Sequence, residues 1–244
     1  MTPRHIACEE LADPWWPGAG SNPRRRSPSR GAESTSDGLR RWAEATPVGG
    51  WQPGGMNQNQ TLEMPVPRGA TDDRTGVAVG AGLVDIDAYI DFQCPFCRQF
   101  ELASGETIDL LLNRQMIRFV RHPMNFLDTA STTRYSTRAA AAAAAASDAR
   151  RFHEYARALF EYQPPEGGPG LTDDQLITLG RTIGITDPSF AGEIQEGRYI
   201  PWPGFVTERA LARGIGGTPS VFIQGKPIPA RPDLILAAVE RLTS

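Results

Sequence analysis

A Cys-x-x-Cys pair, placed where a strand pattern gives way to a helix pattern, constrains this chain more than any other feature. Residues 83–92 alternate apolar and polar side chains, which is typical of a strand. From Pro95 to about Asn113, apolar residues recur every three or four positions and predict a helix. Cys94 thus stands at the helix N-terminus, where unpaired N–H groups and the macrodipole favour a thiolate. Pro95 suits the first turn, because its missing donor costs nothing there.

The spacing of the two cysteines predicts redox chemistry. Cys97 lies within one helical turn of Cys94, close enough to form a disulfide with it. We therefore interpret Cys94 as the catalytic nucleophile and Cys97 as the resolving thiol that attacks a mixed disulfide. Because only Cys94 lies at the open end of the helix, we expect it to be exposed, with a pKa well below the usual value of about 8.5, and Cys97 to be sheltered.

Composition argues against several other classes of protein. Three cysteines in 244 residues are too few for a disulfide scaffold, and a net charge of −3 gives no reason to expect a nucleic-acid partner. No apolar run approaches the roughly 18 residues that a membrane span needs, and the N-terminus lacks the apolar core of a signal peptide. As written, the sequence predicts a cytoplasmic protein without a cofactor, or an extracytoplasmic one if the N-terminus is misassigned.

Residues 1–75 are predicted to be a disordered, Pro/Gly-rich extension. They contain only six Val, Ile, Leu or Phe residues against nine prolines and nine glycines, so they bury too little to offset their ordering entropy. The run Arg24-Arg25-Arg26 fits a solvated tail better than a basic interaction patch. Met56 is an alternative start site, and a chain beginning there should keep its stability and activity.

Residues 76–244 are predicted to form one α/β domain. A second short strand at 117–121 completes a strand–helix–strand unit, whose two strands should be parallel. Residues 131–213 are almost wholly helical in pattern and include eight consecutive alanines, Ala139–Ala146. After them come a strand at 220–224, a short edge strand at 227–229 and a helix from Pro232 to Leu242.

This order resembles the thioredoxin fold with a helical insertion between its βαβ and ββα units, as in the DsbA-like thiol-disulfide oxidoreductases. The resemblance covers about residues 76–244. Its most specific pieces are the Asp-Phe-Gln-Cys-Pro-Phe-Cys run at 91–97 and the Thr-Pro pair at 218 and 219. It implies a protein disulfide oxidoreductase that acts on cysteine-containing protein substrates and is recycled by a redox partner protein or a small thiol.

The resemblance also implies which residues bind the substrate. In the family, the proline before the third sheet strand is cis and lies against the cysteine pair, and the residue before it offers its backbone to an extended substrate segment. Carried over, these residues are Pro219 and Thr218, and we expect a cis bond between them. Pro95 and Phe96, inside the motif, complete the predicted substrate-binding set.

Two positions depart from the family pattern. The family usually has a buried carboxylate six residues before the first cysteine, but this chain has Ala88 there. Asp87 and Asp91 are close in sequence, but strand alternation places them on the opposite face from Ala88. The motif also lacks the histidine of the strongly oxidising members, which removes one positive contribution to thiolate stability.

Two alternatives stay open. Two thiolates at this spacing also make half a zinc site, which His5 and Cys8 would have to complete, although we predict no metal. The other alternative is a non-catalytic module that holds extended peptides in the groove beside Pro219. We interpret His122, His153, Tyr199 and Trp202 as packing or surface residues.

Overall fold

The computed structural model describes residues 64–243, which contain a five-stranded mixed sheet in the order β1-β3-β2-β4-β5. The strands span Val77–Val79 (β1), Val84–Ile90 (β2), Ile117–Pro123 (β3), Ser220–Ile223 (β4) and Lys226–Ile228 (β5). Strands β2 and β3 are parallel, and every other neighbouring pair is antiparallel. The predicted thioredoxin-like fold with a helical insertion is confirmed.

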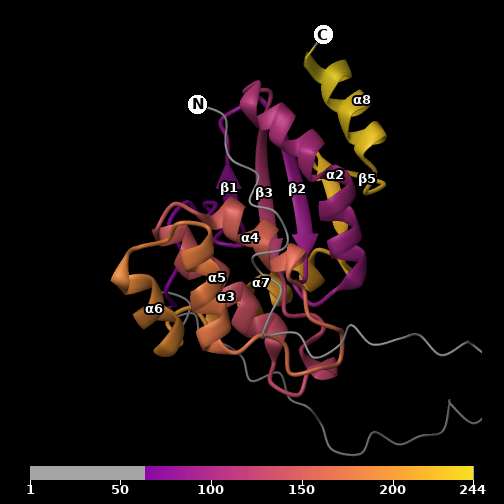
Figure 1. Ribbon diagram of the computed structural model, residues 1–244. Helices are drawn as coiled ribbons and strands as arrows, with labels where there is room; N and C mark the ends of the chain where they lie inside the picture. The colour runs from indigo at the N-terminus through magenta and orange to yellow at the C-terminus, as the bar shows by residue number, and fades with distance from the viewer. Residues whose placement is uncertain (1–63, 244) are drawn as a thin grey trace, which may run out of the picture. The chain divides into compact units, whose positions relative to one another are not determined.

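The helix of the strand–helix–strand unit has the bounds that the sequence predicted. Helix α2 runs from Pro95 to Asn113 and links the parallel strands β2 and β3. It contacts helix α8 (Pro232–Thr243), and Figure 1 shows the two lying beside each other along the sheet. Helix α7 (Pro201–Ala212) contacts β3, and its C-cap residue Arg213 reaches Tyr89 of β2.

Five helices and one 3-10 turn form the insertion between β3 and β4. They are η1 (Asp128–Ala130), α3 (Tyr135–Asp148), α4 (Phe152–Glu161), α5 (Asp173–Thr182), α6 (Pro188–Gln195) and α7. Helix α3 contacts α4, α5, α6 and α7 and is buried on nearly every side. The alanines Ala139–Ala146 explain this central position, because small side chains let neighbouring helices approach closely on all faces. Figure 1 shows α3, α5 and α6 grouped beyond the end of the sheet to which β2 points.

Helix α7 begins at Pro201. Pro201 and Pro203 both lie in its first turn, where a missing N–H breaks no helical hydrogen bond. Trp202, between them, is fully buried, as its packing interpretation required.

Residues 64–75 lie in the described structure, although the sequence placed them in the disordered extension. Thr75 is 1% exposed and its hydroxyl lies 3.2 Å from Nδ1 of His122, while the Trp202 indole donates to the Arg74 carbonyl at 2.8 Å. Strand β1, which was not predicted, follows at once and pairs with β3. The folded part therefore begins earlier than residue 76, and the disorder predicted for residues 1–63 lies outside the described residues.

A shortened chain that begins at Gly76 should be less stable than one that begins at Met64. The shorter chain loses the Thr75 contact to His122 and leaves the buried Trp202 indole N–H without its acceptor. We expect the free energy of unfolding to fall by about 2 to 4 kcal/mol. Urea titrations of the two chains measure this difference, and equal midpoints would show that residues 64–75 add nothing.

Candidate active site

Cys94 is the N-cap residue of α2, as the motif predicted. Its backbone is extended, with φ −73° and ψ 119°, and its N–H donates to the Asp91 carbonyl at 3.0 Å. Pro95 follows in the first turn. The thiol thus lies where the first backbone N–H groups of α2 have no helical partner, which favours negative charge on the sulfur.

The expectation that Cys94 is exposed is wrong in absolute terms. Its residue exposure is only 5%, against 0% for Cys97. The segment before β4 lies close to Cys94. The Cys94 thiol donates to the carbonyl of Thr218, which is 124 residues away in the sequence, at 3.4 Å. The order of accessibility is nevertheless the predicted one, and Cys94 is the sulfur nearer to solvent.

The Thr218-Pro219 peptide bond is cis, as predicted. Both residues are partly exposed, so this backbone is accessible beside the buried sulfur. The structure therefore brings Cys94, Cys97 and Thr218 together.

The two thiols differ in acidity. The pKa of Cys94 is lowered to about 6, chiefly by the Cys97 thiol beside it, with Thr218 and the backbone N–H groups of Cys97 and Phe96 acting in the same direction against the effect of burial. Burial raises the pKa of Cys97 well above its usual range, and Cys94 raises it further. One sulfur is thus a thiolate near neutral pH, and the other is a thiol.

Aromatic side chains lie exposed on the segments around Cys94. Phe96, inside the motif, is 65% exposed. Tyr162 and Phe126 are also exposed, and the residue after each of them bonds to the turn 91–94: Gln163 to the Cys94 carbonyl and Leu127 to the Asp91 carboxylate.

Gln163 is a site residue that the sequence did not predict. Its amide donates to the carbonyls of Phe92 and Cys94 at 2.9 and 3.0 Å, so the segment after α4 fixes the turn that carries the nucleophile. A glutamine followed by Pro164 and Pro165 gives no sequence signal of this role, because its acceptors lie about 70 residues away.

Asp91 lies one residue past the strand whose alternation was used to place its side chain. Strand β2 ends at Ile90, so strand alternation does not fix the direction of the Asp91 side chain. The side chain is 0% exposed, and its carboxylate accepts from the N–H groups of Gln93 at 2.8 Å and Leu127 at 2.9 Å. Its own N–H points at the Cys97 sulfur at 3.4 Å. Asp87 keeps its predicted face and lies 3.0 Å from Nε2 of His122.

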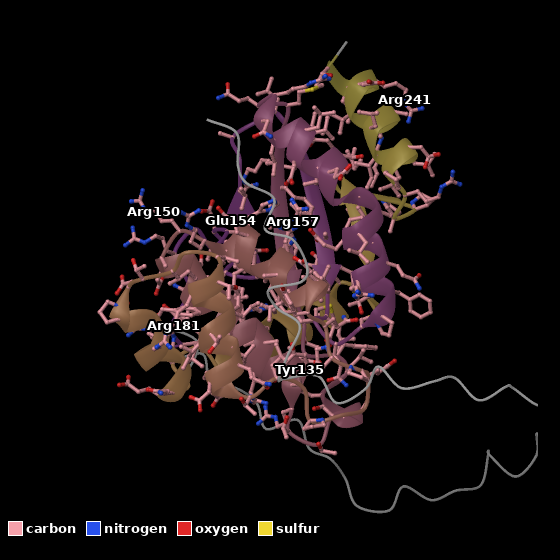
Figure 2. All side chains as sticks on the ribbon, in the orientation of Figure 1. Tyr135, Arg150, Glu154, Arg157, Arg181 and Arg241 are labelled. Atoms are coloured by element: carbon pink, nitrogen blue, oxygen red, sulfur yellow. The ribbon has the colours of Figure 1, made fainter. Side chains whose placement is uncertain are left out.

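A buried ion pair lies beside the position where the family has its carboxylate. Ala88 is fully buried and pairs in register with Arg121 of β3. The Arg121 guanidinium donates to both carboxylate oxygens of Glu101 at 3.0 Å and lies 2.6 Å from Nδ1 of His153. Arg157 of α4, labelled in Figure 2, approaches Glu101 from the surface.

The other candidates do not form a metal site in the described part of the chain. No group of three or more His, Cys, Asp or Glu side chains among residues 64–243 is arranged to hold a metal ion. His122 is buried and stacks on Tyr89 at a centroid distance of 4.2 Å, in keeping with a packing role. His5 and Cys8, the other half of the zinc alternative, lie outside the described residues.

The fold and the paired thiols define a thioredoxin-like redox protein. The family model described as Thioredoxin matches residues 74–241, and the chain belongs to that family. The serine/threonine-protein kinase PknE of Mycobacterium tuberculosis is 32% identical over 131 residues, which are 50% of this chain and 23% of that protein. The chain thus spans less than a quarter of the length of this curated relative.

Solved structures share the fold. The reduced form of the disulfide bond oxidoreductase DsbG from M. tuberculosis is 28% identical with a TM-score of 0.63, covering 69% of this chain and 88% of that one. Reduced DsbA from M. tuberculosis is 27% identical with a TM-score of 0.62, covering 70% and 93%. Oxidised BdbD from Bacillus subtilis, 19% identical with a TM-score of 0.60 and covering 73% and 97%, supports the fold alone. Among the described helices, none is long and apolar enough to cross a membrane.

Alkylation of the reduced protein should separate the two thiols by pH. We expect the rate at Cys94 to rise with a midpoint near pH 6, because that is where its thiolate forms. Cys97 should stay unreactive throughout the rise at Cys94, because burial raises the pKa of its thiol well above the usual value. Mass spectrometry of peptides labelled with iodoacetamide at each pH assigns the sites, and equal rates with unshifted midpoints would contradict the assignment.

Proposed function

We propose that this protein is a thiol-disulfide oxidoreductase that exchanges disulfides with cysteine-containing protein substrates through Cys94-Pro95-Phe96-Cys97. The observation that carries the proposal is the unequal setting of the two sulfurs. Cys94 lies at a helix N-terminus beside an accessible peptide segment, whereas Cys97 lies behind it, fully buried. The similarity to the M. tuberculosis DsbG structure, titled a disulfide bond oxidoreductase, supports the same conclusion.

The exchange proceeds in two displacements. When the pair is oxidised, a substrate thiolate attacks the Cys94 sulfur, and the bond to Cys97 breaks with Cys97 taking the electron pair and a proton. A second substrate thiolate then attacks the substrate sulfur of the mixed disulfide and releases the Cys94 thiolate. Two electrons pass from substrate to protein. The reverse sequence, starting from the Cys94 thiolate, reduces a substrate disulfide.

The backbone of Thr218 and Pro219 supplies the proposed docking site for the substrate. It lies partly exposed against the Cys94 thiol, so an extended substrate segment pairing with it would bring its own sulfur to Cys94. Phe96 and Pro95 border this position, and the exposed Phe96 ring offers apolar contact to substrate side chains. A redox partner protein or a small thiol would restore the starting state.

We place this activity in the thioredoxin-like domain that ends at residue 244, with residues 131–213 as its helical insertion. The preceding Pro/Gly-rich segment is proposed to take no part in exchange. This proposal leaves Cys8 without a catalytic role.

Single-serine variants test the proposed order of attack. With a disulfide-containing substrate, the Cys97→Ser variant should accumulate a mixed disulfide on Cys94, because the resolving thiol is absent. The Cys94→Ser variant should form none and should lose at least about 10³-fold in exchange rate, since the remaining sulfur is buried and protonated. Non-reducing electrophoresis followed by peptide mass spectrometry identifies the adduct.

A double-serine variant distinguishes the alternative of a non-catalytic module. Such a module would keep its affinity for extended peptides without either cysteine and would show no exchange in the wild-type protein. An inactive wild type with unchanged peptide affinity in the double variant would overturn the proposed function.

The redox potential should be less oxidising than that of the strongest DsbA-type proteins. The helix N-terminus stabilises the Cys94 thiolate, but the motif has no histidine to add to it. We expect a potential between about −270 mV, as in thioredoxin, and about −120 mV, as in DsbA. Equilibration with glutathione buffers and quantification of the disulfide fraction measures it. A measured potential outside this range would contradict this expectation.

A further inference from the structure

Asp91 combines burial with direct linkage to both cysteines. Its side chain is fully buried, its carbonyl accepts from the Cys94 N–H at 3.0 Å and its N–H points at the Cys97 sulfur at 3.4 Å. The carboxylate itself is held by two backbone N–H groups, those of Gln93 and Leu127. The backbone of the turn 91–94 thus ties a residue with a buried carboxyl group to both cysteines.

The groups around this carboxyl leave it without a compensating cation. The charges of Cys94, the N-cap residue of α2, and of Tyr135, the first residue of α3, interact with it. Figure 2 labels Tyr135. Asp128 of η1, the residue after Leu127, directs its carboxylate to Thr137 and Arg134 instead. Within residues 64–243, no Arg, Lys or His side chain forms an ion pair with Asp91.

We propose that the protonation of the buried Asp91 carboxyl group depends on the redox state of this site and that reduction of the Cys94–Cys97 disulfide is accompanied by proton uptake on its carboxylate. This inference rests on the proposed oxidoreductase function. Asp91 acts through the charge of Cys94, so it is a positioning residue for the reaction.

Electrostatics gives the direction of the coupling. Burial raises the pKa of Asp91 to about 6, and the negative charge of Cys94 adds to this rise. In the disulfide form that thiolate charge is absent, so the carboxyl group ionises at lower pH. Two like charges in one buried turn disfavour each other, so the carboxylate in turn raises the pKa of Cys94.

The proton balance follows from these charges. Consider a pH at which Asp91 is ionised in the disulfide form and protonated in the dithiol form. Two electrons from a thiol reductant such as glutathione then break the S–S bond. Cys97 takes one proton, Cys94 remains a thiolate, and Asp91 takes a second proton from solvent. Oxidation releases both protons. Reduction therefore takes up between one and two protons in the pH range where Asp91 titrates.

Glu101, on α2, is a second buried carboxylate near the site, and its setting excludes the same role. The Arg121 guanidinium binds both its oxygens, so its negative charge is matched at once by a positive one. Loss of the Glu101 charge would leave the buried Arg121 guanidinium without a carboxylate partner, which is costly. Asp91 has only neutral donors and can change its charge at lower cost.

The Asp91→Asn variant tests the coupling in the reduced full-length protein. Removing the carboxylate should lower the alkylation midpoint of Cys94 by about one pH unit. The Cys94 titration should change from a broad, coupled curve to a one-proton curve. The dithiol fraction in a fixed glutathione buffer at pH 7 should rise. A purely structural role for Asp91 would not shift the Cys94 midpoint downward. A midpoint that is unchanged or higher overturns the proposal.

The Asp87→Asn variant is the matched control. Asp87 lies on β2, its partner is His122, and the same substitution there should leave the Cys94 titration where it is in the wild type. Equal shifts of the Cys94 alkylation midpoint in the two variants would overturn the assignment to Asp91.

A second measurement needs no change at Asp91, in case the Asn variant fails to fold. The carbon-13 shift of the Asp91 carboxyl group reports its own titration in the wild-type protein. We expect a higher midpoint in the dithiol form than in the disulfide form, and equal midpoints overturn the proposal. These titrations require no substrate, so they are independent of the mixed-disulfide experiment that tests the proposed function.

Discussion

The pairing of β2 with β4 is the interaction on which the site depends. The antiparallel register sets Tyr89 opposite Ser220, so the segment before β4 ends beside the turn that follows β2. This register places the Thr218 carbonyl 3.4 Å from the Cys94 sulfur across 124 residues of chain. Because a slip of one residue would turn every side chain of a strand to the opposite face, the buried residues of both strands hold the register in place.

The helical insertion supports the site as well as separating the two halves of the fold. The segment after α4 returns to the turn 91–94 through Gln163, and the segment after β3 returns to it through Leu127. The alanines of α3 make this possible, since they allow four helices to pack around one axis without large side chains between them. The nucleophile is thus held by elements from three separate parts of the sequence.

The local parts of this structure could be predicted from sequence, and the long-range parts could not. Alternation before Cys94 and helical spacing after it predicted β2 and α2, because both patterns are set by which face is buried. Strand β1 has three residues, too few for alternation to show. The near burial of Cys94 and the role of Gln163 depend on partners far along the chain, on which no local pattern reports. Strand alternation gives no basis for placing the Asp91 side chain, because β2 ends one residue before it.

The two buried carboxylates of this site show how neighbouring groups separate stability from reactivity. Glu101 is held by Arg121, a pairing whose loss would leave a charge buried in the core. Asp91 has no such partner, and its pKa of about 6 in the folded protein exceeds the unfolded value of about 3.9. The folded state therefore binds the extra proton, and the stability this provides is lost as the pH rises from about 4 to about 6, an effect on the order of 3 kcal/mol. At neutral pH the folded protein therefore retains a buried carboxylate that lowers its stability. A raised pKa of this kind is typical of functional groups, and here it suits a group whose charge responds to the redox state of the cysteines.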